Sequence, residues 1–147
     1  METVTIPSNA LVLVSDGRRA RLLRNQGTIA NPKLTVERAL EQDNPPTREQ
    51  GTDKPGRMHG SDGVSRSSVE QTDWHQLQEQ RFASELADLL YKLGHAGNYA
   101  ELIVVAPPKM LGDLRSSFHP KVRSAVIAEV AKDLTQYSVP EISDLLS

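Results

Sequence analysis

The sequence predicts a single α/β domain, residues 1–147, with a mixed, mostly five-stranded sheet and flanking helices in a three-layer arrangement. Two short strand-like segments joined by an Asp-Gly pair lie near the start of the chain, and a continuous apolar run, LIVVA, lies in its second half with helical patterns on either side. Strands first, then alternating helices and strands, are typical of a layered mixed sheet. A chain of 147 residues can also bury one sizeable core.

The first forty residues predict three strands. Residues 10–15 form a short apolar run and residues 18–25 follow it, with Asp16-Gly17 between them as a two-residue hairpin signal of the kind that accepts positive φ. Residues 34–40 alternate as expected of a third strand with one half-buried face. Leu34, Val36 and Arg38 fall on one side of that strand, and Thr35, Glu37 and Ala39 fall on the other.

A polar stretch from Asp43 to Asp73 predicts a long loop, although most connections in compact domains are only about 4 to 6 residues long. Prolines block regular backbone pairing in this stretch and glycines permit bends. Its apolar content is close to nil, so it cannot bury enough surface to offset its own ordering entropy. We expect it to be flexible unless a partner orders it.

An amphipathic helix is expected directly after this loop. Ser67 with Glu70, or Asp73 with Gln76, can form a capping box at its start. Gly94 is expected to stop it. The apolar residues at helical spacing are Trp74, Leu77, Phe82, Leu86, Leu89, Leu90 and Leu93.

The run at residues 102–106 predicts a central strand that is covered on both faces. Pro107-Pro108 ends this strand and begins a second amphipathic helix. Binding sites in open sheets lie beyond the carboxyl ends of the strands. The loop after Leu40 and the segment 106–109 are therefore candidate positions for a site.

The C-terminal residues leave one element undecided. Residues 120–134 favour a helix by local propensity, yet Val126, Ala128 and Val130 alternate as in a strand, so periodicity leaves both structures open. Pro140 can open a last short helix that runs almost to the end of the chain.

Composition argues against several kinds of site. The chain has no cysteine, which removes disulfides, thiolate metal ligands and thiol nucleophiles. His59, His75, His95 and His119 lack the close spacing of zinc ligands, so no metal is expected. The serines form no nucleophile elbow, and the glycines form no phosphate-binding loop of recognised spacing. We therefore predict no catalytic residues and no cofactor.

The N-terminal residues predict a soluble, cytoplasmic protein without a membrane span. They carry no basic leader, and the apolar stretch at residues 10–14 is too short for a signal peptide or a span. A net charge of -2 gives no overall attraction to nucleic acid or to an anionic membrane. Any such contact must depend on a local patch.

Three groups of residues are candidates for binding. The hairpin arginines can grip phosphate, or they can be the charged edge that deters sheet-to-sheet aggregation. Basic and acidic residues alternate in the loop, which suits either a flexible recognition element or a solvated insertion. The Trp-His pair at the exit of the loop can stack on a base or cover the end of the core. The candidates are Arg19, Arg21, Arg48, Gln50, Lys54, Arg57, Arg66, Trp74 and His75.

Four stretches carry a resemblance to a known family. They are DNPPTREQGTDKPGR, RSSVEQTDWH with QRFA behind it, LIVVAPPKMLGDLR and HPKVRSAVIAEVAKDLT. Together they resemble the bacterial host-attachment protein family over nearly the whole chain. The resemblance implies a role in the attachment of plant-associated bacteria to host cells. It brings no catalytic residues, but it favours a functional loop over a solvated insertion.

The order of elements also resembles the middle domain of archaeal and eukaryotic peptide-chain release factors. That domain has an α/β fold related to ribonuclease H, so the resemblance implies this fold and favours a strand at residues 125–134. In release factors a Gly-Gly-Gln tip before the long helix promotes peptidyl-tRNA hydrolysis on the ribosome. Gln50-Gly51 and Gln71 do not reproduce that motif. The resemblance therefore implies a ribosomal or RNA partner without the hydrolytic tip.

The expected function is that of a non-enzymatic binding protein that contacts the ribosome or RNA through its long loop. Two alternatives stay open. One is a hydrolase of peptidyl-tRNA or another RNA ester, in which Gln50 or Gln71 orients water. The other is an attachment factor that acts through a protein partner.

Overall fold

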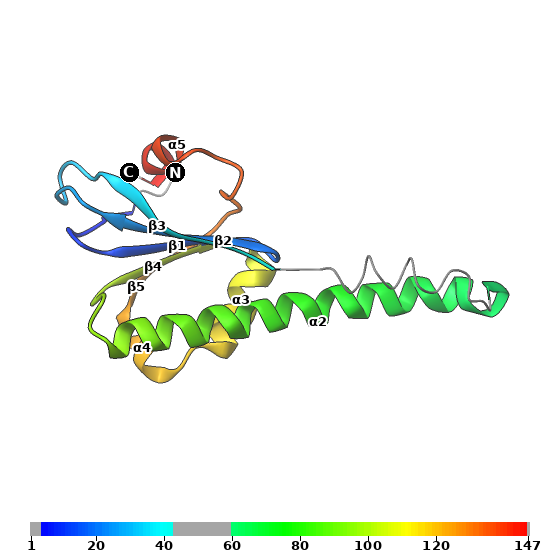
Figure 1. The fold of residues 1–147 in the computed structure, drawn as a ribbon. Helices are drawn as coiled ribbons and strands as arrows, with labels where there is room; N and C mark the ends of the chain where they lie inside the picture. The colour runs from blue at the N-terminus through cyan, green and yellow to red at the C-terminus, as the bar shows by residue number, and fades with distance from the viewer. Residues whose placement is uncertain (1–3, 43–59, 147) are drawn as a thin grey trace.

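A five-stranded sheet lies between two layers of helices (Figure 1). The computed structural model describes the backbone of residues 4–42 and 60–146, and the side chains of residues 4–42 and 74–146. Helices α2, α3 and α4 cover one face of the sheet, and α5 covers the other. The prediction of a three-layer α/β domain is confirmed.

The strand order is β3-β2-β1-β4-β5, which makes the sheet mixed. Strand β1 pairs antiparallel with β2 and parallel with β4, and β4 pairs parallel with β5. Every residue of β1 and β4 is buried, because both strands lie inside the sheet and are covered on both faces. The strands are β1 Leu11–Ser15, β2 Arg19–Asn25, β3 Leu34–Glu41, β4 Leu102–Ala106 and β5 Val126–Ala131.

Two apolar clusters hold the layers together. On the α2 face, alternate strand residues such as Leu13 and Val104 pack with Phe82, Leu86 and Leu90 of the helix. On the α5 face, the opposite residues of the same strands pack with α5 and with residues just before β1. The sheet thus separates the buried residues into two clusters, one on each face.

Strand β3 departs from the predicted alternation because it contains a bulge. Leu22 of β2 pairs with Arg38, while the next residue, Leu23, pairs with Val36, which leaves Glu37 without a partner. The extra residue moves Arg38 to the opposite face from Val36, since one inserted residue reverses the alternation. Most of β3 is exposed, so the expected half-buried face is wrong for this edge strand.

Helix α2 spans Gly60–His95, so the predicted loop is too long at its C-terminal end. Residues 60–73 are helical, and both predicted capping boxes lie inside the helix. The remainder of the predicted loop, residues 43–59, lies outside the described residues. The start of α2 runs beyond the sheet, where no core requires an apolar stripe, and so the sequence carried no periodic signal for it (Figure 1).

The other end of α2 is closed by Gly97 rather than by Gly94. Gly97 has a φ of 79°, and the Asn98 N–H donates to the Leu93 carbonyl over 2.9 Å while the Gly97 N–H donates to the Gly94 carbonyl over 3.0 Å. This is the hydrogen-bond pattern of a Schellman cap. Gly94 lies within the helix, where a Cβ would meet the Tyr99 hydroxyl at 3.1 Å.

The C-terminal third contains three more helices, α3 Pro108–Ser117, α4 Pro120–Ala125 and α5 Val139–Leu146. The undecided residues 120–134 divide between α4 and β5, so propensity was right for the first part and the resemblance for the second. The strand ends at Ala131 and is shorter than the 125–134 expected. Within the described residues, no helix is long and apolar enough to span a membrane.

Candidate functional site

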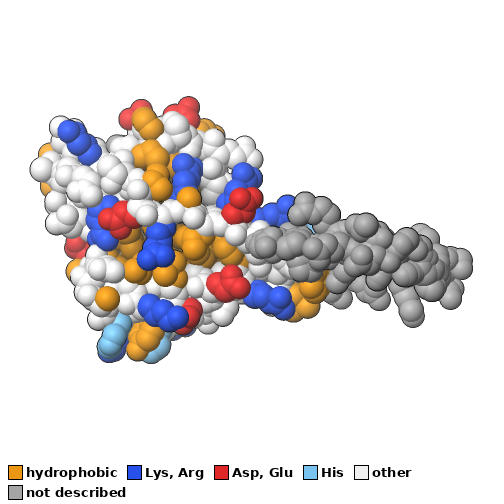
Figure 2. Space-filling view, in the orientation of Figure 1, with side chains coloured by type: hydrophobic (Ala, Val, Ile, Leu, Met, Phe, Trp, Pro, Cys, Tyr) orange, Lys and Arg blue, Asp and Glu red, His pale blue; other side chains and the backbone are white. Residues whose placement is uncertain are grey.

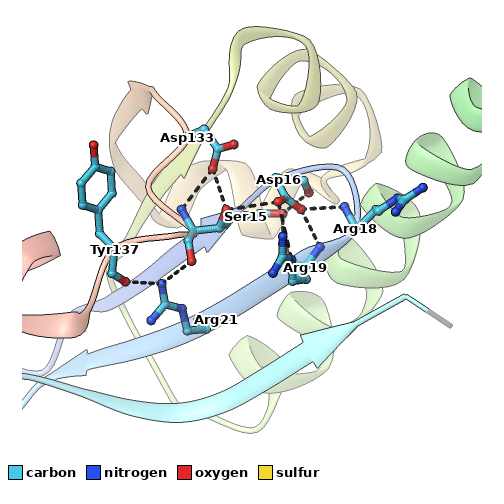
Figure 3. A network of polar contacts seen from close by, with 8 residues as sticks. Ser15, Asp16, Arg18, Arg19, Arg21, Asp133 and Tyr137 are labelled. Atoms are coloured by element: carbon cyan, nitrogen blue, oxygen red, sulfur yellow. Dashed lines mark hydrogen bonds and ion pairs between the residues drawn. The ribbon is translucent and has the colours of Figure 1, made fainter.

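The parallel strands β1, β4 and β5 end at the same edge of the sheet, here called the carboxyl edge. Three segments meet there: the turn after β1, the start of α3 after β4, and the loop between β5 and α5 (Figure 3). Ligand sites of open α/β sheets form at this edge. It also holds Arg19 and Arg21, two of the predicted binding residues.

The hairpin between β1 and β2 is confirmed, but its turn differs from the one predicted. The Asp16 carboxylate accepts hydrogen bonds from the backbone N–H groups of Arg18, at 2.7 Å, and Arg19, at 2.6 Å. Gly17 does not have positive φ. It is small for another reason, because a Cβ there would lie 2.7 Å from the Glu79 side chain of α2. The turn therefore rests directly against α2.

Arg21 ties the β5–α5 loop to the sheet. Its Nη2 donates to the carbonyl of Thr135 over 2.8 Å and to that of Tyr137 over 2.7 Å. The Thr135 hydroxyl contacts Asp133 Oδ1 at 2.6 Å and Asp16 Oδ2 at 3.1 Å. All of these contacts except that of Thr135 with Asp133 join residues more than 110 positions apart, and Figure 3 shows them as one network. The guanidinium of Arg21 is thus engaged within the fold.

Arg21→Gln is expected to lower the free energy of unfolding by about 1 to 2 kcal/mol, because hydrogen bonds from a charged donor to two carbonyls are lost at a partly exposed site. Arg19→Gln is the matched control, since Arg19 is 55% exposed and its Nε lies 3.9 Å from Asp16. The control should change stability by less than about 0.5 kcal/mol. Urea denaturation measures both values, and equal effects would remove the structural role assigned to Arg21.

Arg24 is also paired. Its Nε donates to Glu37 Oε2 over 2.9 Å and its Nη2 to Glu37 Oε1 over 3.0 Å. Its Nη1 donates to the Asn9 carbonyl over 3.0 Å. The hydrogen bond from Arg24 lowers the pKa of the Glu37 carboxyl below its ordinary value. The basic cluster predicted on this hairpin is therefore partly neutralised.

This pairing predicts a pH-dependent contribution to stability. Because the pKa of Glu37 is lower in the folded state, its contribution is full above pH 4.5 and is lost as the pH falls below that value through the folded-state pKa. Glu37→Gln should therefore destabilise the protein slightly near neutral pH, by about 0.5 kcal/mol at this exposed pair, and not in acid. Thermal unfolding on both sides of pH 4.5 tests this, and a pH-independent difference would contradict it.

Two arginines of the turn remain exposed at the carboxyl edge. The Arg18 side chain makes no ion pair with a described residue, and the pair of Arg19 with Asp16 is long. Lys109, at the start of α3, is balanced by Glu79 at 3.7 Å and Asp113 at 3.4 Å. On the face shown in Figure 2, basic and acidic side chains are interspersed. This edge therefore offers local cations without a continuous basic surface.

The remaining predicted binding residues lie on α2 or outside the described residues. Trp74 is half-buried and His75 is exposed on α2, about one turn before Glu79, which contacts the β1–β2 turn. Both uses of the Trp74 ring that the sequence suggests, stacking on a base and covering the end of the core, stay predictions. The backbone of Arg66 is helical, but its side chain lies outside the described residues, as do Arg48, Gln50, Lys54 and Arg57.

A family model for bacterial archaeo-eukaryotic release factor family 12 matches residues 9–146. The chain belongs to this family. A curated relative in Rickettsia prowazekii (strain Madrid E), the uncharacterized protein RP470, is 43% identical over 44 residues, which are 30% of this chain and 29% of that protein. The match thus spans less than a third of the relative.

A solved release-factor structure also matches part of its length. The crystal structure of the archaeal translation termination factor aRF1 matches with a TM-score of 0.42 and 15% sequence identity, over 84% of this chain and 30% of that chain.

Among the described residues, no three histidine or carboxylate side chains are placed to hold a metal ion. The sequence analysis missed the role of Asp16, although an aspartate before a turn is a known signal for such capping.

Proposed function

We propose that this protein is a non-enzymatic binding protein that contacts the ribosome or RNA through the segment at residues 43–59. Membership of the release-factor family supports a partner in translation. The observation that carries the proposal is the length of α2 and its placement. This helix has 36 residues, and its first part projects beyond the sheet (Figure 1).

The projecting part of α2, residues 60–77, acts as an arm, because Gln78 and Glu79 already contact the body of the domain. The first described buried side chain of the helix is Phe82, and the rise of 1.5 Å per residue sets Gly60 roughly 33 Å from it. The segment 43–59 directly precedes Gly60, the residue at the tip of this arm. Such an arm can carry a short segment into a narrow site on a large particle, while the sheet stays outside.

The residue types of that segment suit contact with RNA. Arg48, Lys54 and Arg57 provide cations for phosphates, and Gln50 provides an amide for a base or a backbone group. Glu49 and Asp53 lie between the cations. Charge alone is therefore a weak source of affinity, and we expect recognition to depend on side-chain hydrogen bonds as well. The exposed Arg18, Arg19 and His75 can add contacts at the base of the arm.

Binding of purified protein to purified ribosomes tests this proposal. Arg57→Ala should weaken binding by about tenfold, as expected for one lost charged contact, with an unchanged melting temperature. Arg38→Ala is the control, because Arg38 is an exposed cation of β3 on the body of the domain. Equal binding by the wild type and Arg57→Ala, or a stability loss of about 2 to 5 kcal/mol as for a core truncation, would contradict the proposal.

The alternative of hydrolysis has a direct test. The chain lacks the Gly-Gly-Gln motif, so we expect no release of labelled peptide from stalled ribosomes. Release that is lost in Gln50→Ala or Gln71→Ala would replace the binding role by an enzymatic one. The host-attachment role implied by resemblance is, in our proposal, an indirect consequence of contact with the translation machinery; capture of a protein partner in place of ribosomes would favour the direct role.

A further inference from the structure

A cavity of about 380 Å³ lies between the C-terminal end of α2 and helix α4, far along α2 from the arm. Tyr91 and His95 of α2 line it on one side, and Lys121 and Ser124 of α4 line it on the other. Tyr99 also lines it. This volume falls within the range of small-molecule sites.

The Tyr91 and His95 rings both line the cavity, and the ring of His119, which does not line it, packs against Tyr91. The Tyr91 ring centroid lies 4.3 Å from that of His119 and 6.1 Å from that of His95, with interplanar angles of 33° and 27°. Such an array presents flat, polarisable surfaces on which a further planar ring can pack. Figure 2 shows histidine side chains together with a hydrophobic one at this lower edge of the molecule.

The described residues that line the cavity include basic side chains and no acidic ones. Lys121 and His95 line it, and none of its described lining residues is acidic. Lys121 is exposed, and its ammonium forms no ion pair within the described residues. The terminal carbonyls of α2 do not offset this cation strongly, because those of Lys92, Leu93 and Gly94 already accept backbone hydrogen bonds. The cavity therefore favours an anionic group near Lys121.

The other polar atoms of the lining determine which hydrogen-bonding groups a ligand can present to the cavity. The Ser124 hydroxyl donates to the carbonyls of Pro120 and Lys121, each at 3.1 Å, which leaves its oxygen free to accept. The Tyr99 hydroxyl donates to the Leu90 carbonyl at 2.7 Å, and burial raises the pKa of Tyr99, so its phenol stays protonated. The Tyr91 phenol and the His95 ring make no hydrogen bond to a described residue and can pair with a ligand.

We propose that this cavity binds a nucleotide, with its base packed on the Tyr91–His95 wall and its phosphate held by Lys121. A planar ring with polar edges and one attached anion matches the aromatic wall, the unpaired polar atoms and the single lysine. The same chemistry is offered by a free nucleoside monophosphate and by an unpaired residue of RNA. The inference that the ligand is an RNA residue rests on the proposed function, whereas the inference that it is a free nucleoside monophosphate does not.

Calorimetric titration of the full chain with adenosine 5′-monophosphate, adenosine and a single-stranded octa-adenylate RNA tests the proposal. Lys121→Gln should weaken binding of the monophosphate by about tenfold and bring it close to that of adenosine. Tyr91→Leu should weaken all the ligands that bind by about tenfold, since stacking on one ring is lost. Lys132→Gln, at an exposed lysine just after β5, is the control and should bind like the wild type.

The outcomes separate the two sources of the ligand. Binding of the monophosphate that is sensitive to Lys121→Gln supports a free nucleotide, whereas binding of the RNA alone, with the same sensitivity, supports an RNA residue. Failure of all the ligands to bind, or equal binding by the wild type and Lys121→Gln, overturns the proposal. Lys121 is exposed, so this variant stays informative even if Tyr91→Leu does not fold. Replacing residues 47–59 changes none of the described residues that line the cavity. A failure of ribosome contact can therefore be distinguished from a failure of nucleotide binding.

Discussion

Leu90→Ala is expected to lower the free energy of unfolding by about 2 to 5 kcal/mol. Leu90 is fully buried in the cluster that joins α2 to the sheet, where it packs in the same core as Leu13 and Val104. Truncation to alanine removes apolar contacts and leaves a cavity that the surrounding strands cannot fill, because β1 and β4 are buried and paired on both sides. A loss of unfolding free energy of this size is expected because the C-terminal half of α2 belongs to the core.

Leu77→Ala is the matched control on the same helix. Leu77 is 53% exposed and lies about three and a half turns closer to the tip of the arm, so its truncation should change stability by less than about 0.5 kcal/mol. Urea denaturation with a common slope measures both variants. A loss at Leu77 as large as that at Leu90 would mean that the start of α2 is packed against the domain and does not project.

Asn25→Ala is expected to cost about 2 to 4 kcal/mol, the second largest effect. Asn25 is fully buried at the end of β2. Its Oδ1 accepts from the N–H groups of Gly27 and Lys33, each at 2.9 Å, and its Nδ2 donates to the carbonyls of Ile6, at 3.0 Å, and Pro7, at 3.1 Å. Alanine would leave these backbone groups without partners in a buried site.

The control for this network is Asn31→Ala, in the same loop. Asn31 is exposed, and its side chain makes no hydrogen bond to a described residue, so the change should stay within about 0.5 kcal/mol. Hydrogen exchange adds a spatial test. The amides of Gly27 and Lys33 should lose protection in Asn25→Ala before the rest of β2 does. Unchanged protection of both amides would contradict the role of Asn25.

Local signals predicted those parts of the fold that depend on burial. The continuous apolar run at residues 102–106 predicted a central strand covered on both faces, and this is confirmed. The Asp-Gly pair marked the hairpin, and Pro108, Pro120 and Pro140 each fall at the start of a helix. These patterns are sufficient because the core dictates the residue type at each such position.

The features that the sequence did not predict depend on contacts between distant residues or on the absence of a core. The start of α2 has a polar sequence because it projects past the sheet, so it looked like a loop. The bulge at Glu37 is set by the pairing of β3 with β2, which the alternation of β3 alone cannot reveal. Arg21 looked like a free cation, and only the fold brings the carbonyls of Thr135 and Tyr137 to it.

The candidate site was predicted in part. The carboxyl edge, the exposed turn arginines and the Trp74-His75 pair follow from strand order and from motifs. The stack of Tyr91 with His95 and His119 does not, because His119 belongs to a different element and comes close only when α4 packs against α2. The spacing of histidines along the sequence can indicate metal ligands. It does not reveal contacts between rings that are far apart in the sequence.

The central claim is that residues 43–59, which directly precede α2 in the sequence, bring this release-factor relative to the ribosome. The most direct measurement is sedimentation of tagged protein from cell lysate through a sucrose gradient at low and high salt. Wild type is compared with a chain in which residues 47–59 are replaced by a Gly-Ser segment of equal length. We expect salt-sensitive comigration of the wild type with ribosomal particles, and migration of the variant at the top of the gradient. Equal sedimentation of both chains, at the top or with the particles, would contradict the claim.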